Sequence, residues 1–139
     1  QGLVLKLDRE RRQFVRVPLP YKGTLFGVIG TPQMAMVFGL RGNAWRSTDG
    51  GANWTRTTTG VNAGLASGAV RGDGSILLAS QAGQLLRSKD EGATFDRVAV
   101  GRVAPVFALA ASATQGVALG GPDGVRVEWL KDKEANRAQ

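Results

Sequence analysis

Short apolar runs alternate with glycine-containing turns along most of the chain. Residues 24–29, 34–38, 43–47 and 54–58 form four such runs, which are rich in Val, Phe, Trp and Thr. Runs of this length, bounded by Gly, Pro and Asn, are typical of β-strands. No segment keeps the 3.6-residue period of a long amphipathic helix. The pattern therefore predicts an all-β fold.

The same pattern returns after a fixed interval. The sequence Ser-x-Asp-x-Gly-x-x-Trp, which begins at Ser47, recurs with Phe in place of Trp from Ser88, an offset of 88 − 47 = 41 residues. The same offset relates Gly42 to Gly83. Four short antiparallel strands in a unit of about forty residues match one blade of a β-propeller. We therefore predict propeller blades of four antiparallel strands.

The repeat predicts a partial propeller over residues 1–130, with about three to three and a half blades. Its predicted parts are the end of one blade (1–18), two full blades (24–58 and 65–99), a last blade without its outer strand (105–130) and a polar C-terminal tail (131–139). Closed propellers use ~4–8 blades. We therefore expect a larger propeller, in which further blades come from the rest of a longer chain or from another copy.

Each repeated Ser-x-Asp motif predicts a hairpin turn between the two outer strands of a blade. The carboxylate can accept hydrogen bonds from turn N–H groups, the glycine allows a positive φ, and the aromatic ring can pack beside the hairpin. Calcium binding or catalysis by the two aspartates is the alternative, and the structural interpretation is favoured. The structural residues predicted are Ser47, Asp49, Gly51, Trp54, Ser88, Asp90, Gly92 and Phe95.

This motif is the Asp box, and residues 39–54 resemble a blade of the photosystem II assembly and stability factor family. The resemblance extends over about residues 24–127, and similar propellers occur in non-photosynthetic bacteria, often exported. Sialidases and other glycosidases share the Asp box, away from their active sites. The resemblance implies a non-enzymatic scaffold that binds partner proteins, with basic residues contributing to the binding face. It also implies a periplasmic or otherwise exported location.

The amino-acid composition excludes several kinds of catalytic and metal site. The 139 residues contain neither Cys nor His. This excludes a disulfide, a thiolate nucleophile, a Ser-His-Asp triad and a Cys- or His-ligated metal. We accordingly predict no metal and no cofactor. No apolar run approaches the ~20 residues of a membrane span, so direct membrane insertion is not expected.

Basic residues exceed acidic ones, with a formal net charge of +7. Residues 1–22 hold six Lys or Arg against two Asp or Glu, which is +4 of that total. The basic cluster at residues 9–12 is interpreted as an exposed hairpin tip, because no aromatic residues are interleaved with it. We therefore predict a protein partner with an acidic surface and no nucleic-acid partner.

The predicted binding face is the one opposite the Asp boxes. Loops between the second and third strands and loops between blades should meet there. Arg41 is singled out because its counterpart in the next repeat is Ala82, so blade architecture does not require it. The recurring pair Arg56 and Arg97 is interpreted as marking structural or solvated strand positions. The candidate binding residues are Arg41, Asn43, Lys22, Tyr21 and Arg102.

Two other functions remain open at this point. A fragment of a sialidase-like glycoside hydrolase would need two carboxylates across a sugar, or a tyrosine nucleophile with a carboxylate partner. The only tyrosine, Tyr21, has no carboxylate near it in sequence, so no enzymatic activity is expected. A carbohydrate-binding propeller would need exposed aromatic platforms. Trp45 and Trp54 are instead expected in the core, and Trp129 in the last strand.

Overall fold

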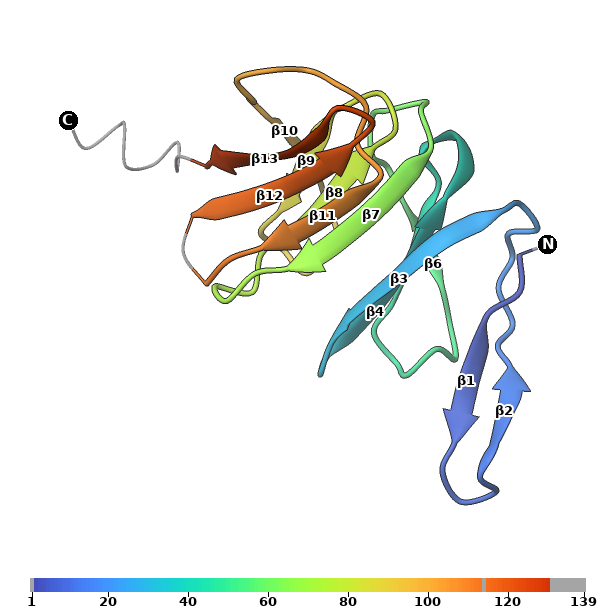
Figure 1. Cartoon of the computed structure of the whole chain (residues 1–139). Helices are drawn as coiled ribbons and strands as arrows, with labels where there is room; N and C mark the ends of the chain where they lie inside the picture. The colour runs from blue at the N-terminus through green and yellow to red at the C-terminus, as the bar shows by residue number, and fades with distance from the viewer. Residues whose placement is uncertain (1, 114, 131–139) are drawn as a thin grey trace.

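The computed structural model describes residues 2–113 and 115–130, and within them the regular structure is almost entirely β (Figure 1). Thirteen strands form four antiparallel sheets in these residues, together with one short 3₁₀ turn, η1 (Leu40–Gly42). None of the described helices is long and apolar enough to cross a membrane. The predicted all-β fold is confirmed.

Each sheet is a meander whose strands are neighbours in sequence order. The first sheet pairs β1 (Leu5–Asp8) with β2 (Gln13–Arg16). The second contains β3 (Leu25–Thr31), β4 (Met34–Gly39), β5 (Ala44–Ser47) and β6 (Thr55–Thr57). The third contains β7 (Leu65–Val70), β8 (Ile76–Ser80), β9 (Leu85–Ser88) and β10 (Asp96–Val98), and the fourth β11 (Ala108–Ala111), β12 (Gly116–Gly121) and β13 (Gly124–Trp129).

Two strands are shorter than the sequence pattern suggested. The apolar runs at residues 2–7 and 105–110 predict strands, but the first forms a strand only from Leu5 and the second only from Ala108. Pro105 has no backbone N–H to give to a sheet. Its carbonyl oxygen instead lies against Gly121. The predicted tail, residues 131–139, lies outside the described residues.

The hydrophobic core lies between successive sheets, and β8 belongs to two parts of it. Ile76 and Leu78 join the cluster between the second and third sheets, whereas Leu77 and Ala79 join the cluster between the third and fourth. Successive strand residues point to opposite faces. All five residues of β8 are therefore buried, because their sheet is covered on both sides (Figure 1).

Basic side chains link each of the first two sheets to the turn of the next. Lys6 Nζ on β1 donates to the carbonyl oxygen of Gly50 at 2.7 Å. Arg46 Nε on β5 donates to the carbonyl oxygen of Glu91, also at 2.7 Å. Gly50 and Glu91 are equivalent in the 41-residue repeat. The recurring basic residue therefore has a structural role at Arg46.

Apolar side chains are exposed at both ends of the series of sheets. Val125, Val127 and Trp129 alternate along β13 and are 77%, 55% and 69% exposed. At the other end, Leu5 and Leu7 of β1 and Phe14 of β2 are exposed as well. Trp129 lies in the last strand, as expected, and is exposed because in the described residues no further sheet covers its face of β13. Trp45 and Trp54 are only half-buried rather than in the core.

Candidate functional site

The first Asp box folds into a closed hydrogen-bonded turn after β5. Ser47 Oγ accepts the N–H of Gly51 at 2.9 Å and donates to Asp49 Oδ1 at 2.8 Å. The same carboxylate accepts the Asn53 N–H at Oδ1 and the Asn53 amide at Oδ2. Gly51 has φ +91°, and the indole of Trp54 donates to its carbonyl oxygen. Both Asp49 oxygens are thus used within the turn.

The second Asp box repeats this arrangement after β9. Ser88 Oγ accepts the N–H of Gly92 at 2.8 Å and donates to Asp90 Oδ1 at 2.7 Å. Thr94 takes the place of Asn53, donating its N–H to Oδ1 and its hydroxyl to Oδ2 of Asp90. Phe95 is half-buried and packs against the first core cluster. Nowhere among the described residues do three or more potential metal ligands gather.

These hydrogen bonds hold the carboxylates in their charged form. The Asn53 N–H and amide lower the pKa of Asp49 to about 2, and the Thr94 hydroxyl and N–H lower the pKa of Asp90 to about 2. The pKa falls because these hydrogen-bond donors stabilise the charged carboxylate more than the protonated acid. The shift makes the stability of the fold depend on pH below the ordinary range of a carboxyl group.

We expect acid to weaken the fold through these two turns. A pKa that is lower in the folded state than in the unfolded chain stabilises the fold above about pH 4, and the contribution is lost as pH falls toward about 2. The double variant Asp49→Asn, Asp90→Asn should therefore lose less stability across this window. Thermal unfolding followed by circular dichroism from pH 6 to pH 2 measures it, with exposed Asp96→Asn as control. An unchanged pH dependence in the double variant would contradict the prediction.

On the opposite end of the sheets, the turn between β4 and β5 brings three of the predicted binding residues together. Asn43 Nδ2 donates to the carbonyl oxygen of Leu40 at 2.8 Å, and the Tyr21 hydroxyl lies 3.5 Å from the same oxygen. The Tyr21 ring stacks on Trp45 with centroids 6.1 Å apart. Asn43 and Tyr21 thus hold the turn in place, and the exposed Arg41 lies at its tip.

Arg41 lines a basic hollow, which we call the Arg41 hollow. Its volume is about 530 Å³, and its lining is formed by residues 41–42 and 56–62. Arg56 is the second cation in this lining, which contains no Asp or Glu. Arg97 extends the positive charge, since its Nη2 lies 3.5 Å from the carbonyl oxygen of Gly60. Sequence reasoning missed Arg56, because its recurrence at Arg97 was interpreted as marking a structural or solvated strand position.

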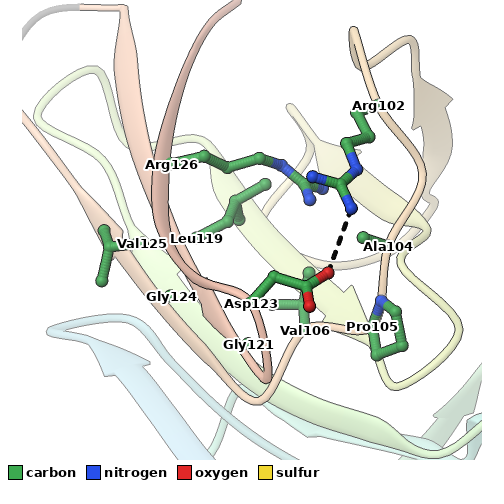
Figure 2. Close-up of a pocket in the computed structure, with 10 residues that line it drawn as sticks. All are labelled: Arg102, Ala104, Pro105, Val106, Leu119, Gly121, Asp123, Gly124, Val125 and Arg126. Carbon is green, nitrogen blue, oxygen red and sulfur yellow. Dashed lines mark hydrogen bonds and ion pairs between the residues drawn. The ribbon is translucent and has the colours of Figure 1, made fainter.

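The other two predicted residues lie apart from Arg41. Lys22 lines a separate hollow with Tyr21 and Arg16. Arg102, in the loop between β10 and β11, pairs with Asp123 in the turn between β12 and β13 (Figure 2). The Arg102 Nη2 to Asp123 Oδ2 distance is 3.0 Å. The predicted single cationic surface is therefore divided into three places.

Comparison by sequence finds no similar protein, whereas comparison by structure does. No family model matches the chain, and no curated protein matches it in sequence. The chain is similar in structure to the extracellular domain of the putative one-component system BT4673 from B. thetaiotaomicron. That match has 17% identity and a TM-score of 0.67, and covers 88% of this chain and 18% of the other.

A second similar structure is YCF48 bound to D1 peptide. It matches with 11% identity and a TM-score of 0.57, over 90% of this chain and 46% of the other. Both neighbours are β-propellers, so the chain has the β-propeller fold, as predicted. It spans less than half the length of either of these solved chains.

Proposed function

We propose that this chain is a non-enzymatic β-propeller scaffold that binds an acidic segment of a partner protein in the Arg41 hollow. One observation carries the proposal: two arginines line this hollow and no carboxylate neutralises them there. A guanidinium group pairs with a carboxylate through two parallel hydrogen bonds. The similar structure of YCF48, which is described as bound to D1 peptide, supports a peptide as the ligand.

The backbone of Arg41 gives further support. Its φ is +57°, in the left-handed region, whereas the equivalent Ala82 has no positive φ. A left-handed conformation costs a non-glycine residue roughly 1–2 kcal/mol. Strained backbone conformations of this kind are commonly kept where they position a residue in a functional site. The turn geometry therefore favours a binding role for Arg41 over a merely solubilising one.

Charge reversal at Arg41 tests the proposal. The probe is a fluorescein-labelled glutamate-rich peptide, with its glutamine counterpart as the uncharged reference, and binding is followed by fluorescence anisotropy. Arg41→Glu should weaken binding by about tenfold or more, because a charge-assisted hydrogen bond contributes about 1.5–3 kcal/mol. Arg9→Glu makes the same charge change on the exposed β1–β2 turn. Equal weakening by both variants, or equal binding of the glutamine peptide, would contradict the proposal.

The absence of enzymatic activity is part of the proposal. Asp73 accepts hydrogen bonds from the N–H and hydroxyl of Ser75, and Asp123 pairs with Arg102. The Tyr21 hydroxyl is directed to a carbonyl oxygen rather than to a carboxylate. These partners support structural roles for the groups that a glycosidase would use. Hydrolysis of a fluorogenic sialoside or glycoside by the protein would contradict this part.

We also propose that the chain acts outside the cytoplasm, as an Asp-box propeller akin to the photosystem II assembly factor family and its non-photosynthetic relatives. The extracellular placement of one similar structure supports export. The lack of Cys makes the fold independent of the redox state of its compartment. Fractionation of the producing cells tests this, and recovery in the cytoplasmic fraction alone would contradict it.

The last part of the proposal concerns what covers the exposed face of the last sheet. Val125, Val127 and Trp129 present an apolar surface of the kind that is covered in the two preceding sheets. We propose that another blade packs on this face, which for the isolated chain means a second copy. The 139-residue chain should then self-associate in light scattering, and Val127→Asp should shift it toward monomer. A monomer at every concentration would contradict a second copy as the occupant.

A further inference from the structure

A second, smaller pocket lies where the loop between β10 and β11 meets the turn between β12 and β13 (Figure 2). Its volume is about 140 Å³. Arg102, Asp123 and Arg126 supply its charged lining, and its apolar lining includes Ala104, Val106 and Leu119. We call it the Arg102–Arg126 pocket. The recurring blade pattern does not account for two arginines on this small space.

Arg126 is held on the inner side of β13. Arg126 pairs with Leu119 and Glu128 with Val117 in the sheet register, so their side chains share the face that packs on the third sheet. Glu128 forms an ion pair with the arginine. Its Oε1 lies 3.5 Å from Arg126 Nε, and its Oε2 accepts the Gly101 N–H at 3.2 Å.

The outer nitrogen of Arg126 is left without an acceptor. Arg126 Nη2 is buried and has no hydrogen-bond partner among the described residues. Buried polar groups in folded proteins are almost always paired, so an orphaned guanidinium nitrogen calls for an explanation. Figure 2 shows the guanidinium groups of Arg126 and Arg102 directed toward the same space above Asp123. The Arg126 side chain as a whole is 25% exposed, so a ligand oxygen can approach its guanidinium group from that space.

The charges in the pocket also favour a ligand that carries a carboxylate. Asp123 is the one carboxylate in the lining and pairs with Arg102, whereas Arg126 pairs with Glu128 outside the lining. Arg102 remains 65% exposed, so its guanidinium can rotate to share a second acceptor. The cavity is smaller than the ~300–1,000 Å³ of pockets for larger ligands. It therefore suits a carboxylate with a short apolar group.

We propose that the Arg102–Arg126 pocket binds a carboxylate that carries a short apolar group. The two guanidinium groups receive the carboxylate, and Ala104, Val106 and Leu119 contact the apolar group. The source is either a free small organic acid or the C-terminal carboxylate of a peptide. This proposal does not rest on the Arg41 hollow, since the two pockets share no lining residue.

NMR of the full 139-residue chain tests the proposal, using the arginine Nε–Hε resonances. One arm adds isovalerate, with isovaleramide as the uncharged isostere. The other adds a tetrapeptide that ends in a free leucine carboxylate, with its C-terminal amide as reference. Saturable shifts of Arg102 and Arg126 by an acid, absent with its amide, are expected. The arm that binds more tightly identifies the source.

Variants separate a binding site from a structural ion pair. Arg102→Gln, at an exposed side chain, should weaken carboxylate binding about tenfold, whereas Arg97→Gln should leave it unchanged. Asp123→Asn removes the competing carboxylate and should tighten binding severalfold. The proposal is overturned if neither acid shifts the two arginines saturably, if acid and amide act alike, or if Asp123→Asn weakens binding. The Arg41→Glu variant should still bind the acid, which keeps this result separate from the proposed function.

Discussion

Gly42→Ala is expected to lower the free energy of unfolding by about 2–4 kcal/mol. A Cβ at this position would lie 1.9 Å from the carbonyl oxygen of Val61. That oxygen belongs to the loop between two sheets, so neither backbone can yield without moving a blade. The φ of +69° adds the cost of a left-handed alanine. Guanidinium-induced unfolding followed by circular dichroism measures the loss.

Gly60 provides the matched control for this substitution. It has a similar φ of +72°, but a Cβ there would meet nothing within 4 Å. Gly60→Ala should therefore cost only about 1 kcal/mol, the share that comes from backbone conformation. Equal losses at the two glycines would show that the contact with Val61 is unimportant. The contact also bears on binding, because Gly42 and Val61 both line the Arg41 hollow.

Leu77→Ala and Leu78→Ala are each expected to cost about 2–5 kcal/mol. Both side chains are completely buried, yet they point to opposite faces of β8 and belong to different core clusters. A strand with one solvent-facing side would lose stability at only one of two successive residues. Large losses at both would establish that the third sheet is covered on both sides.

The control for the two leucines is Val28→Ala on β3. Val28 is 69% exposed, so the substitution should change stability by no more than about 0.5 kcal/mol. Denaturant unfolding of all three variants at one pH gives the comparison. A small loss at either Leu77 or Leu78 would mean that one of the two neighbouring sheets does not pack as described.

Much of the fold could be predicted from the sequence because a blade is a local structure. Strands of four to six residues and turns with fixed residue requirements repeat at a constant offset, so each unit supports the interpretation of the next. The Ser47 and Ser88 hydrogen bonds join residues only two to four positions apart. The ends of strands were less predictable where they depend on contacts with a neighbouring segment, as at Pro105.

The candidate site was less predictable because it depends on distances between blades. Arg56 was passed over as a repeated residue, and the structure places it beside Arg41. The pairing of Arg102 with Asp123 joins residues 21 positions apart and could not be derived from the repeat. Burial of the two tryptophans was overestimated for a related reason, since it depends on what covers each sheet.

The links between sheets have a consequence for how such a chain can grow. Lys6 and Arg46 each donate to a main-chain carbonyl oxygen in the turn of the following sheet. The accepting residues differ, Gly50 in one case and Glu91 in the other, because every residue offers the same oxygen. A duplicated unit would therefore find its acceptor on any neighbour without a compensating substitution. Propeller genes can in this way gain a blade in a single duplication and retain a stable joint between old and new copies.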